Sequence, residues 1–105
     1  MRKENESVVR GLLGLCQRAG KLQSGGDMAL AAIRTGKACC ALLDADASAN
    51  TAKKMTDSCA YYHVTLLLLP AGMLGSACGR EGRMTAAVCD AGFASKLQTL
   101  MTEAE

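Results

Sequence analysis

The sequence is poor in aromatic residues, and it has a single proline, a single histidine and no tryptophan. Its three aromatic side chains are Tyr61, Tyr62 and Phe93, so a core has to be built from aliphatic residues, methionine and cysteine. The longest fully apolar run, residues 66–75, is too short to cross a bilayer. The N-terminus also lacks the apolar stretch of a secretory signal. These absences predict a cytoplasmic protein with no membrane association.

The composition is that of a folded chain. Half of the residues are hydrophobic and 21% are charged, which argues against disorder. A chain of this size buries about two-thirds of its surface on folding, which is enough for one independent core. We therefore expect a single domain over residues 1–105, with frayed ends at residues 1–6 and 102–105.

Six cysteines are present without the spacing of a metal site or of a disulfide framework. No Cys-x-x-Cys pair occurs, and adjacent residues such as Cys39 and Cys40 point to opposite faces of a strand. The single His63 has no second histidine nearby. We interpret the cysteines as small core residues and expect no metal and no cofactor. A thiol- or metal-dependent regulator is the alternative interpretation of these residues.

Helical and strand patterns alternate along the chain. Apolar spacing predicts five helices, namely residues 6–19, a segment from the turn at residues 24–27 to Gly36, a segment capped by Ser48 or Asn50, a short segment after Pro70, and a C-terminal segment around Leu97. Short apolar runs predict four strands, namely residues 21–23, 38–43, 64–69 and 84–89. This alternation predicts an α/β layer structure with helices on both faces of a central sheet.

The sequence contains no arrangement of residues that catalysis would need. Asp44 and Asp46 follow a predicted strand, but no third carboxylate is nearby, so loop structure and helix capping explain them better than Mg²⁺. No phosphate-binding motif is complete, because Gly25-Gly26 lacks the third glycine of a dinucleotide fingerprint. No nucleophile is paired with a base. We therefore expect a protein without enzymatic activity.

A glycine-containing turn and several basic residues predict an anion-binding surface. Residues 24–27 open a helix, where free backbone N–H groups attract phosphate and glycine lets a ligand approach closely. When residues 1–7 and 102–105 are left out, ten basic and six acidic side chains remain, a charge of +4. An ordinary solvated surface explains this charge equally well.

A family resemblance extends over roughly residues 8–100. The stretches that carry it are residues 11–21, 24–26, 32–38, 46–54, 59–64, 74–79 and 90–94. Taken in order, they resemble the kink-turn RNA-binding ribosomal-protein family of the L7Ae type, in its bacterial YlxQ-like branch. The resemblance implies a three-layer α-β-α sandwich around a mixed four-stranded sheet. It also implies RNA binding and no catalysis.

The resemblance also implies where RNA would bind. Three elements form the RNA surface of the family, and here they are the glycine turn (residues 24–28), the aspartate loop (residues 44–52) and the arginine loop (residues 80–85). The expected RNA-binding residues are Lys21, Gly25, Gly26, Asp27, Arg34, Lys53, Arg80 and Arg83. The glycines and Asp27 would shape the contact, and the basic residues would neutralise phosphates. Ribosomal or other structured RNA is the expected partner, with ribosomal proteins as further partners.

The chain departs from the family pattern at the second helix. The pattern Gly-x-Asn-Glu-x-x-Lys keeps its glycine at Gly25, whereas Asp27, Met28 and Ala31 replace the asparagine, the glutamate and the lysine. These changes remove a donor, a polar group and a phosphate contact, so base-specific readout is reduced. We expect a non-catalytic RNA-binding protein with degenerate kink-turn readout. The alternative is a protein-interaction module that keeps the fold and has lost RNA binding.

Overall fold

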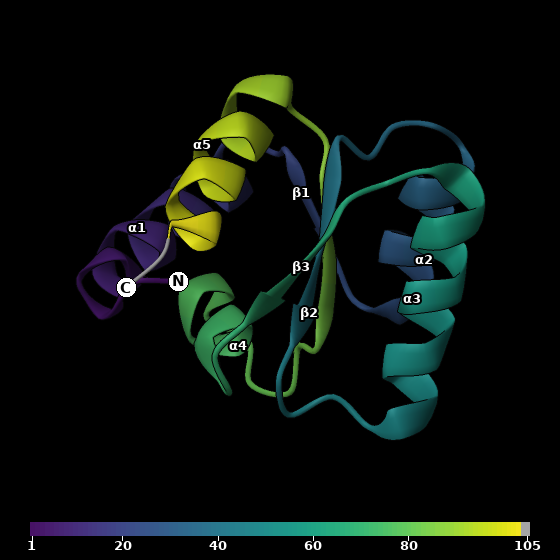
Figure 1. Cartoon of the computed structure of the whole chain (residues 1–105), viewed down its shortest axis with the longest axis horizontal. Coiled ribbons are helices and arrows are strands. Elements are labelled where there is room, and N and C mark those ends of the chain that lie inside the picture. Colours follow the sequence, from purple (N-terminus) through teal and green to yellow (C-terminus); the bar gives the residue numbers. More distant parts are fainter. Residues whose placement is uncertain (104–105) are drawn as a thin grey trace.

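The computed structural model describes residues 1–103 as a four-stranded sheet with helices on both faces (Figure 1). The elements, in order, are η1 (Lys3–Asn5), α1 (Glu6–Arg18), β1 (Leu22–Ser24), α2 (Gly26–Arg34), β2 (Cys40–Asp44), α3 (Ala49–Tyr62), β3 (Leu66–Leu69), α4 (Met73–Cys78), β4 (Thr85–Val88) and α5 (Ala91–Thr102). The strand order is β1-β4-β2-β3, so the last strand of the chain is inserted between the first and the second.

The sheet is mixed, as the resemblance implied. Strands β2 and β3 are parallel, and β4 is antiparallel to both β1 and β2. In the register of the central strands, Leu42 lies opposite Leu67 on one side and opposite Ala86 on the other. Every residue of β2 is buried, which explains why its first four residues, 40–43, are all apolar.

Two hydrophobic layers complete the α-β-α sandwich. Helices α1, α4 and α5 cover one face of the sheet, and α2 and α3 cover the other (Figure 1). Because successive side chains of a strand point to opposite faces, Leu42 packs in the first layer with Leu13 and Leu97. Leu43 packs in the second layer with Met55. The predicted fold class is therefore confirmed.

Some helices and strands begin at other residues than predicted, because local hydrogen bonds or backbone conformation set their ends. Strand β1 begins at Leu22 because the N–H of Lys21 donates to the C=O of Cys16 at the end of α1 (3.0 Å). Strand β3 begins at Leu66 because the chain leaves α3 through His63 in the left-handed region (φ 58°). Ser48, rather than Asn50, caps α3: its hydroxyl accepts the N–H of Thr51 at 3.2 Å.

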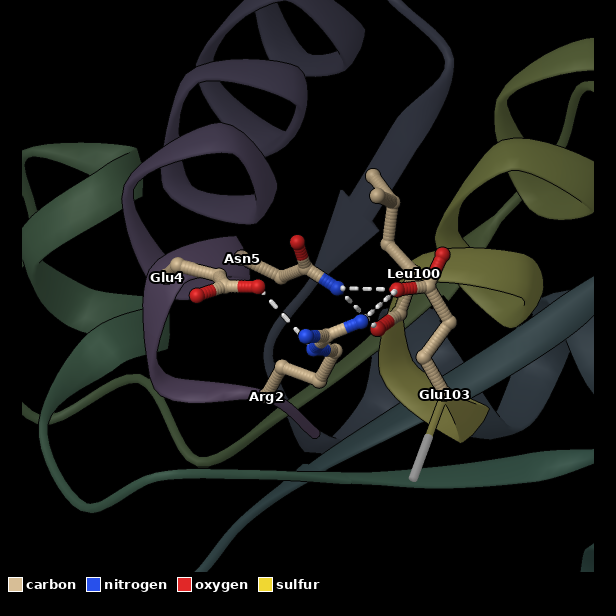
Figure 2. A network of polar contacts seen from close by, with 5 residues as sticks. All are labelled: Arg2, Glu4, Asn5, Leu100 and Glu103. Carbon is tan, nitrogen blue, oxygen red and sulfur yellow. Dashed lines mark hydrogen bonds and ion pairs between the residues drawn. The ribbon is translucent and has the colours of Figure 1, made fainter. Parts of the chain in front are cut away.

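The N-terminal residues contact the end of α5, and the fraying expected for residues 1–6 stays a prediction. After η1, the amide of Asn5 donates to the C=O of Leu100 (3.1 Å) and to the carboxylate of Glu103 (3.0 Å), as Figure 2 shows. The Arg2 guanidinium lies 4.0 Å from the same carboxylate. These contacts fasten the start of α1 to the end of α5. Sequence patterns do not reveal them, because the partners are 95 or more residues apart.

Helix α5 continues to Thr102, whose hydroxyl donates to the C=O of Gln98 at 2.6 Å. The fraying expected for residues 102–105 stays a prediction, and residues 104–105 lie outside the described residues. Among residues 1–103, no helix has the length and apolar character that a membrane span requires.

Candidate nucleic-acid interface

The glycine turn joins β1 to α2 through a backbone conformation that only glycine adopts readily. Gly25 has φ 102° and ψ 153°, and its N–H donates to the C=O of Thr85 in β4 (2.9 Å). Its C=O accepts the N–H of Ala29, which starts the helix. No side chain caps α2, so the N–H groups of its first turn are available to an external acceptor.

Arg83 of the arginine loop lies against this turn. A Cβ built on Gly25 would be only 2.5 Å from Nη1 of Arg83, so the guanidinium packs directly against the glycine. The sequence places these residues 58 positions apart, and the antiparallel pairing of β1 with β4 brings them together. A positive charge therefore lies beside the first-turn amide groups of α2.

The arginine loop is held by backbone contacts with α4 and β2. The N–H of Arg80 donates to the C=O of Gly75 (2.9 Å), and the N–H of Arg83 donates to the C=O of Arg80 (3.4 Å). Gly75 has to be a glycine, because a Cβ there would be 2.9 Å from the C=O oxygen of Arg80. Arg80 and Arg83 thus belong to one loop that backbone hydrogen bonds hold in place, at the same end of the molecule as Gly25.

A buried carboxylate organises the aspartate loop. Asp44, 1% exposed, accepts the N–H groups of Asp46 (2.9 Å), Gly72 (3.1 Å) and Leu74 (3.4 Å). Asp44 therefore joins its own loop to the start of α4. This agrees with the expectation that loop structure and helix capping, rather than Mg²⁺, explain this aspartate. Among the described residues, no group of three or more histidine, cysteine or acidic side chains is placed to hold a metal ion.

Two hollows lie at the end of the sheet where the three loops meet, and Arg83 lines the second. The first, of about 120 Å³, is lined by Gly26, Asp27, Leu30, Thr51, Lys54, Met55 and Thr85. The second, of about 420 Å³, is lined by Asp46, Gly72, Gly75, Ser76, Glu81, Gly82, Arg83 and Met84. Residues from the glycine turn, the aspartate loop and the arginine loop therefore share one end of the sheet.

Only some of the predicted site residues are brought together. Gly25, Gly26 and Asp27 form the turn, Arg83 packs on it, and Arg80 belongs to the same loop as Arg83. These five residues form the candidate interface.

Three predicted cationic residues lie elsewhere or are engaged. Arg34 is in the last turn of α2, eight residues from Gly26, a rise of about 12 Å. Lys21 precedes β1, and its C=O accepts the N–H of Cys89, at the opposite end of the strand from Gly25. Lys53 is exposed and pairs with Asp57 one helical turn away (2.9 Å).

Sequence reasoning missed Lys54 as the lysine that faces the glycine turn. It lines the first hollow together with Thr51 and Met55, which share its side of α3. Because Met55 is buried, the i, i+3, i+4 spacing of these residues was the available indication. Lys54, Arg80 and Arg83 together supply three cations, and the nearby carboxylates of Asp27, Asp46 and Glu81 balance them formally.

The altered positions of α2 form a more apolar surface. Met28, 55% exposed, and Ala31 line a hollow beside β1 with Gln23, Ala32, Thr35, Lys37 and Cys89. Among these residues only Lys37 is charged. The face that carries glutamate and lysine in the family pattern therefore offers little to hydrogen-bond a base.

The cysteines are free thiols, and four of the six are buried. Burial is the main cause that raises the pKa of Cys16 to about 11 and the pKa of Cys40 to about 12. Burial also raises the pKa of Cys78, although Arg83 and Arg80 oppose this change. Thiols that stay protonated are poor nucleophiles and poor metal ligands, which agrees with the interpretation of the four buried cysteines as core residues. That interpretation is wrong for Cys39, which is exposed, and Cys89 is only half-buried.

Comparison with known proteins places the chain in a family. Residues 7–98 match the Ribosomal protein L7Ae/L30e/S12e/Gadd45 family. The chain belongs to this family. It is similar to two proteins named RNA-binding protein YlxQ, which identifies the YlxQ-like branch. The protein from Bacillus subtilis (strain 168) is 47% identical over 91 residues, 86% of this chain and 91% of the relative. The protein from Enterococcus faecium is 35% identical over 102 residues, 96% and 98% of the two chains.

Solved structures agree with this placement. A protein with unknown function from Bacillus halodurans C has a TM-score of 0.85 and 35% identity, with 90% of this chain and 97% of that chain covered. A Giardia lamblia 15.5kD RNA binding protein has a TM-score of 0.75 and 19% identity, with 95% and 92% covered. At that identity the second likeness supports the fold alone.

Proposed function

We propose that this chain binds structured RNA without catalysing a reaction, through the end of the sheet where the glycine turn meets the arginine loop. The observation that carries the proposal is the packing of the Arg83 guanidinium against Gly25, beside the uncapped first turn of α2. The name RNA-binding protein, given to two relatives of nearly full length, supports it.

The chemistry of this end suits a phosphate backbone. Free N–H groups at a helix N-terminus and a guanidinium both donate hydrogen bonds to phosphate oxygens. Gly25 and Gly26 have no side chain that would keep a backbone away. Lys54 adds a charge in the lining of the first hollow, and Arg80 adds a second charge in the arginine loop. Backbone hydrogen bonds hold the glycine turn and the arginine loop in place, so the backbone needs little ordering on binding.

The expected readout is of backbone and shape rather than of base edges. Asp27, Met28 and Ala31 lack the donor, the acceptor and the cation of the family pattern, and Met28 and Ala31 line an apolar hollow. Phosphate contacts position a protein, whereas base contacts specify a sequence. We therefore propose degenerate kink-turn readout, with ribosomal or other structured RNA as the partner in the cytoplasm.

Filter binding of a folded kink-turn RNA over a salt series tests the proposal. With up to three phosphates neutralised by Lys54, Arg80 and Arg83, the plot of log K against log salt should have a slope of about −2 to −3. Arg83→Ala should weaken binding about tenfold and reduce the slope by about 1. Arg34→Ala is the matched control, because it removes the same charge at the far end of α2.

Two results would contradict the proposal. One is binding that does not depend on salt, because a phosphate interface releases counterions. The other is an equal loss in Arg83→Ala and Arg34→Ala, which would mean that net charge, and not this interface, governs binding. A pull-down with nuclease treatment tests the alternative, a protein-interaction module. Such a module would keep its protein partners after the nuclease treatment, and it would bind no purified RNA.

A further inference from the structure

Helix α1 carries a second apolar stripe that the core does not use. Val9, Leu13 and Cys16 face the sheet and are fully buried. Val8 and Leu15 are 51% and 49% exposed, and their spacing of seven residues places them on one side of the helix. A single exposed leucine is ordinary, whereas aligned exposed side chains at helical spacing indicate a contact surface.

The stripe borders a groove between α1 and α5. Leu12 and Leu15 line it from α1, and Gly92, Phe93 and Lys96 line it from α5 around a hollow of about 470 Å³. Phe93 packs against the core with its inner side and leaves part of its ring at the groove. Gly92 has no side chain to fill it. The walls are two helices, and such a groove suits a third helix.

The two walls are fastened to each other. Figure 2 shows Asn5, at the start of α1, donating to the C=O of Leu100 and to the carboxylate of Glu103 at the end of α5. Arg2 contacts Glu103 and also pairs with Glu4 (3.0 Å). These contacts hold the two helices together at the end of the pair away from the shallow groove, which lowers the entropic cost of ordering the helices when a ligand binds.

The charges around the groove indicate what would occupy it. Lys96 lines the groove, and Arg18 is exposed one turn beyond Leu15 on the same side of α1. The only carboxylate in the lining, Asp90, already caps α5 by accepting the N–H of Phe93 (2.9 Å). Lys96 and Arg18 therefore favour anionic side chains in whatever occupies the groove.

From these observations we propose that the α1–α5 groove docks an amphipathic helix of another protein, with its apolar side chains on the stripe and its acidic residues toward Lys96 and Arg18. This site is separate from the candidate RNA interface. The groove involves residues that follow β4, whereas the arginine loop precedes β4, so the two sites lie at opposite ends of that strand. The chain would then connect an RNA to a protein helix.

Photocrosslinking in cells tests the proposal. A benzophenone amino acid replaces Leu15 in the full chain, and the crosslinked partner segments are identified by mass spectrometry after nuclease treatment. We expect one helix-forming segment with an excess of aspartate and glutamate. The same probe at Leu68, an exposed leucine of β3 (64%), is the matched control and should not capture it. Capture of RNA, of a second copy of this chain, or of no protein above the Leu68 control would overturn the proposal.

A direct measurement then uses the captured segment as a synthetic peptide. Lys96 is exposed, so Lys96→Glu preserves the fold, and it should weaken peptide binding about tenfold in calorimetry because it places like charges together. RNA binding should not change in the same variant. Unchanged peptide affinity in Lys96→Glu would refute the assigned charge of the partner. Loss of RNA binding would refute the separation of the two sites.

Discussion

The substitution Gly25→Ala, which adds one methyl group, tests the role of the glycine turn most directly. Gly25 has φ 102° and ψ 153°, a region that residues with a Cβ hardly populate. The new Cβ would also lie 2.5 Å from Nη1 of Arg83. That atom ends a flexible side chain, so the guanidinium can move aside at small cost. The backbone cannot, because the N–H of Gly25 is bonded to Thr85.

Two effects of different size therefore follow from this substitution. Forcing a non-glycine residue into this region costs about 1–3 kcal/mol. For a chain of this length, a loss of about 2 kcal/mol lowers Tm by roughly 8–16 °C. The displaced Arg83 no longer lies beside the first turn of α2, so RNA affinity should fall about tenfold in addition.

Thermal unfolding followed by circular dichroism, together with filter binding, measures both effects. For the stability effect, Gly26→Ala is the matched control, because Gly26 is helical, has nothing within 4 Å of a built Cβ and has no positive φ. Alanine there should be neutral or stabilise by about 0.5–1 kcal/mol. If Gly25→Ala leaves Tm no lower than Gly26→Ala does, the reasoning on the glycine turn is wrong.

Other perturbations test the rest of the molecule. Asp44→Ala leaves three N–H groups without their acceptor and should cost about 3 kcal/mol or more in urea unfolding, with Asp44→Asn less severe; equal stability of both variants with the parent would contradict this role. The pKa of the Cys40 thiol is raised from 9.0 to about 12, mainly by burial, so the fold favours the neutral thiol. The resulting stability is complete below about pH 9 and is lost as the pH rises toward 12, and urea unfolding in Cys40→Ala should show a smaller alkaline loss. Combining Asp27→Asn, Met28→Glu and Ala31→Lys restores the family pattern and should raise the preference for a kink-turn over a duplex in competition binding; an unchanged preference would show that other residues limit the readout.

Sequence patterns predicted the fold well because each element has a local physical cause. The predicted run at residues 38–43 is apolar throughout, and its last four residues form the buried strand β2 together with Asp44. The 8/12/16 and 9/13 spacings predicted α1, in which Val9, Leu13 and Cys16 are buried. The ends of elements were harder to predict, since a cap or a distant hydrogen bond decides them. Ser48 and the left-handed His63 set the limits of α3 in this way.

The interface was predicted less completely, because it depends on contacts between distant segments. The glycine turn and the arginine loop were expected to cooperate only through the family resemblance. No local pattern reveals that Arg83 packs on Gly25. Nearness in sequence does not bring Arg34 to the glycine turn, because it shares a helix with Gly26 but lies at the other end of that helix. A count of charges treats every lysine as equivalent. In the structure, Lys53 pairs with Asp57, whereas Lys54 lines the first hollow.

The insertion of β4 between β1 and β2 explains why one end of the sheet gathers these loops. Because β4 is antiparallel to both neighbours, the loop before it lies beside the segment that follows β1 and the segment that follows β2. Two backbone bonds record this arrangement, from Gly25 to Thr85 (2.9 Å) and from Asp44 to Met84 (2.8 Å). The glycine turn, the aspartate loop and the arginine loop are therefore adjacent as a result of topology. Substitutions at Asp27, Met28 and Ala31 change the chemistry of this end without moving the backbone that assembles it.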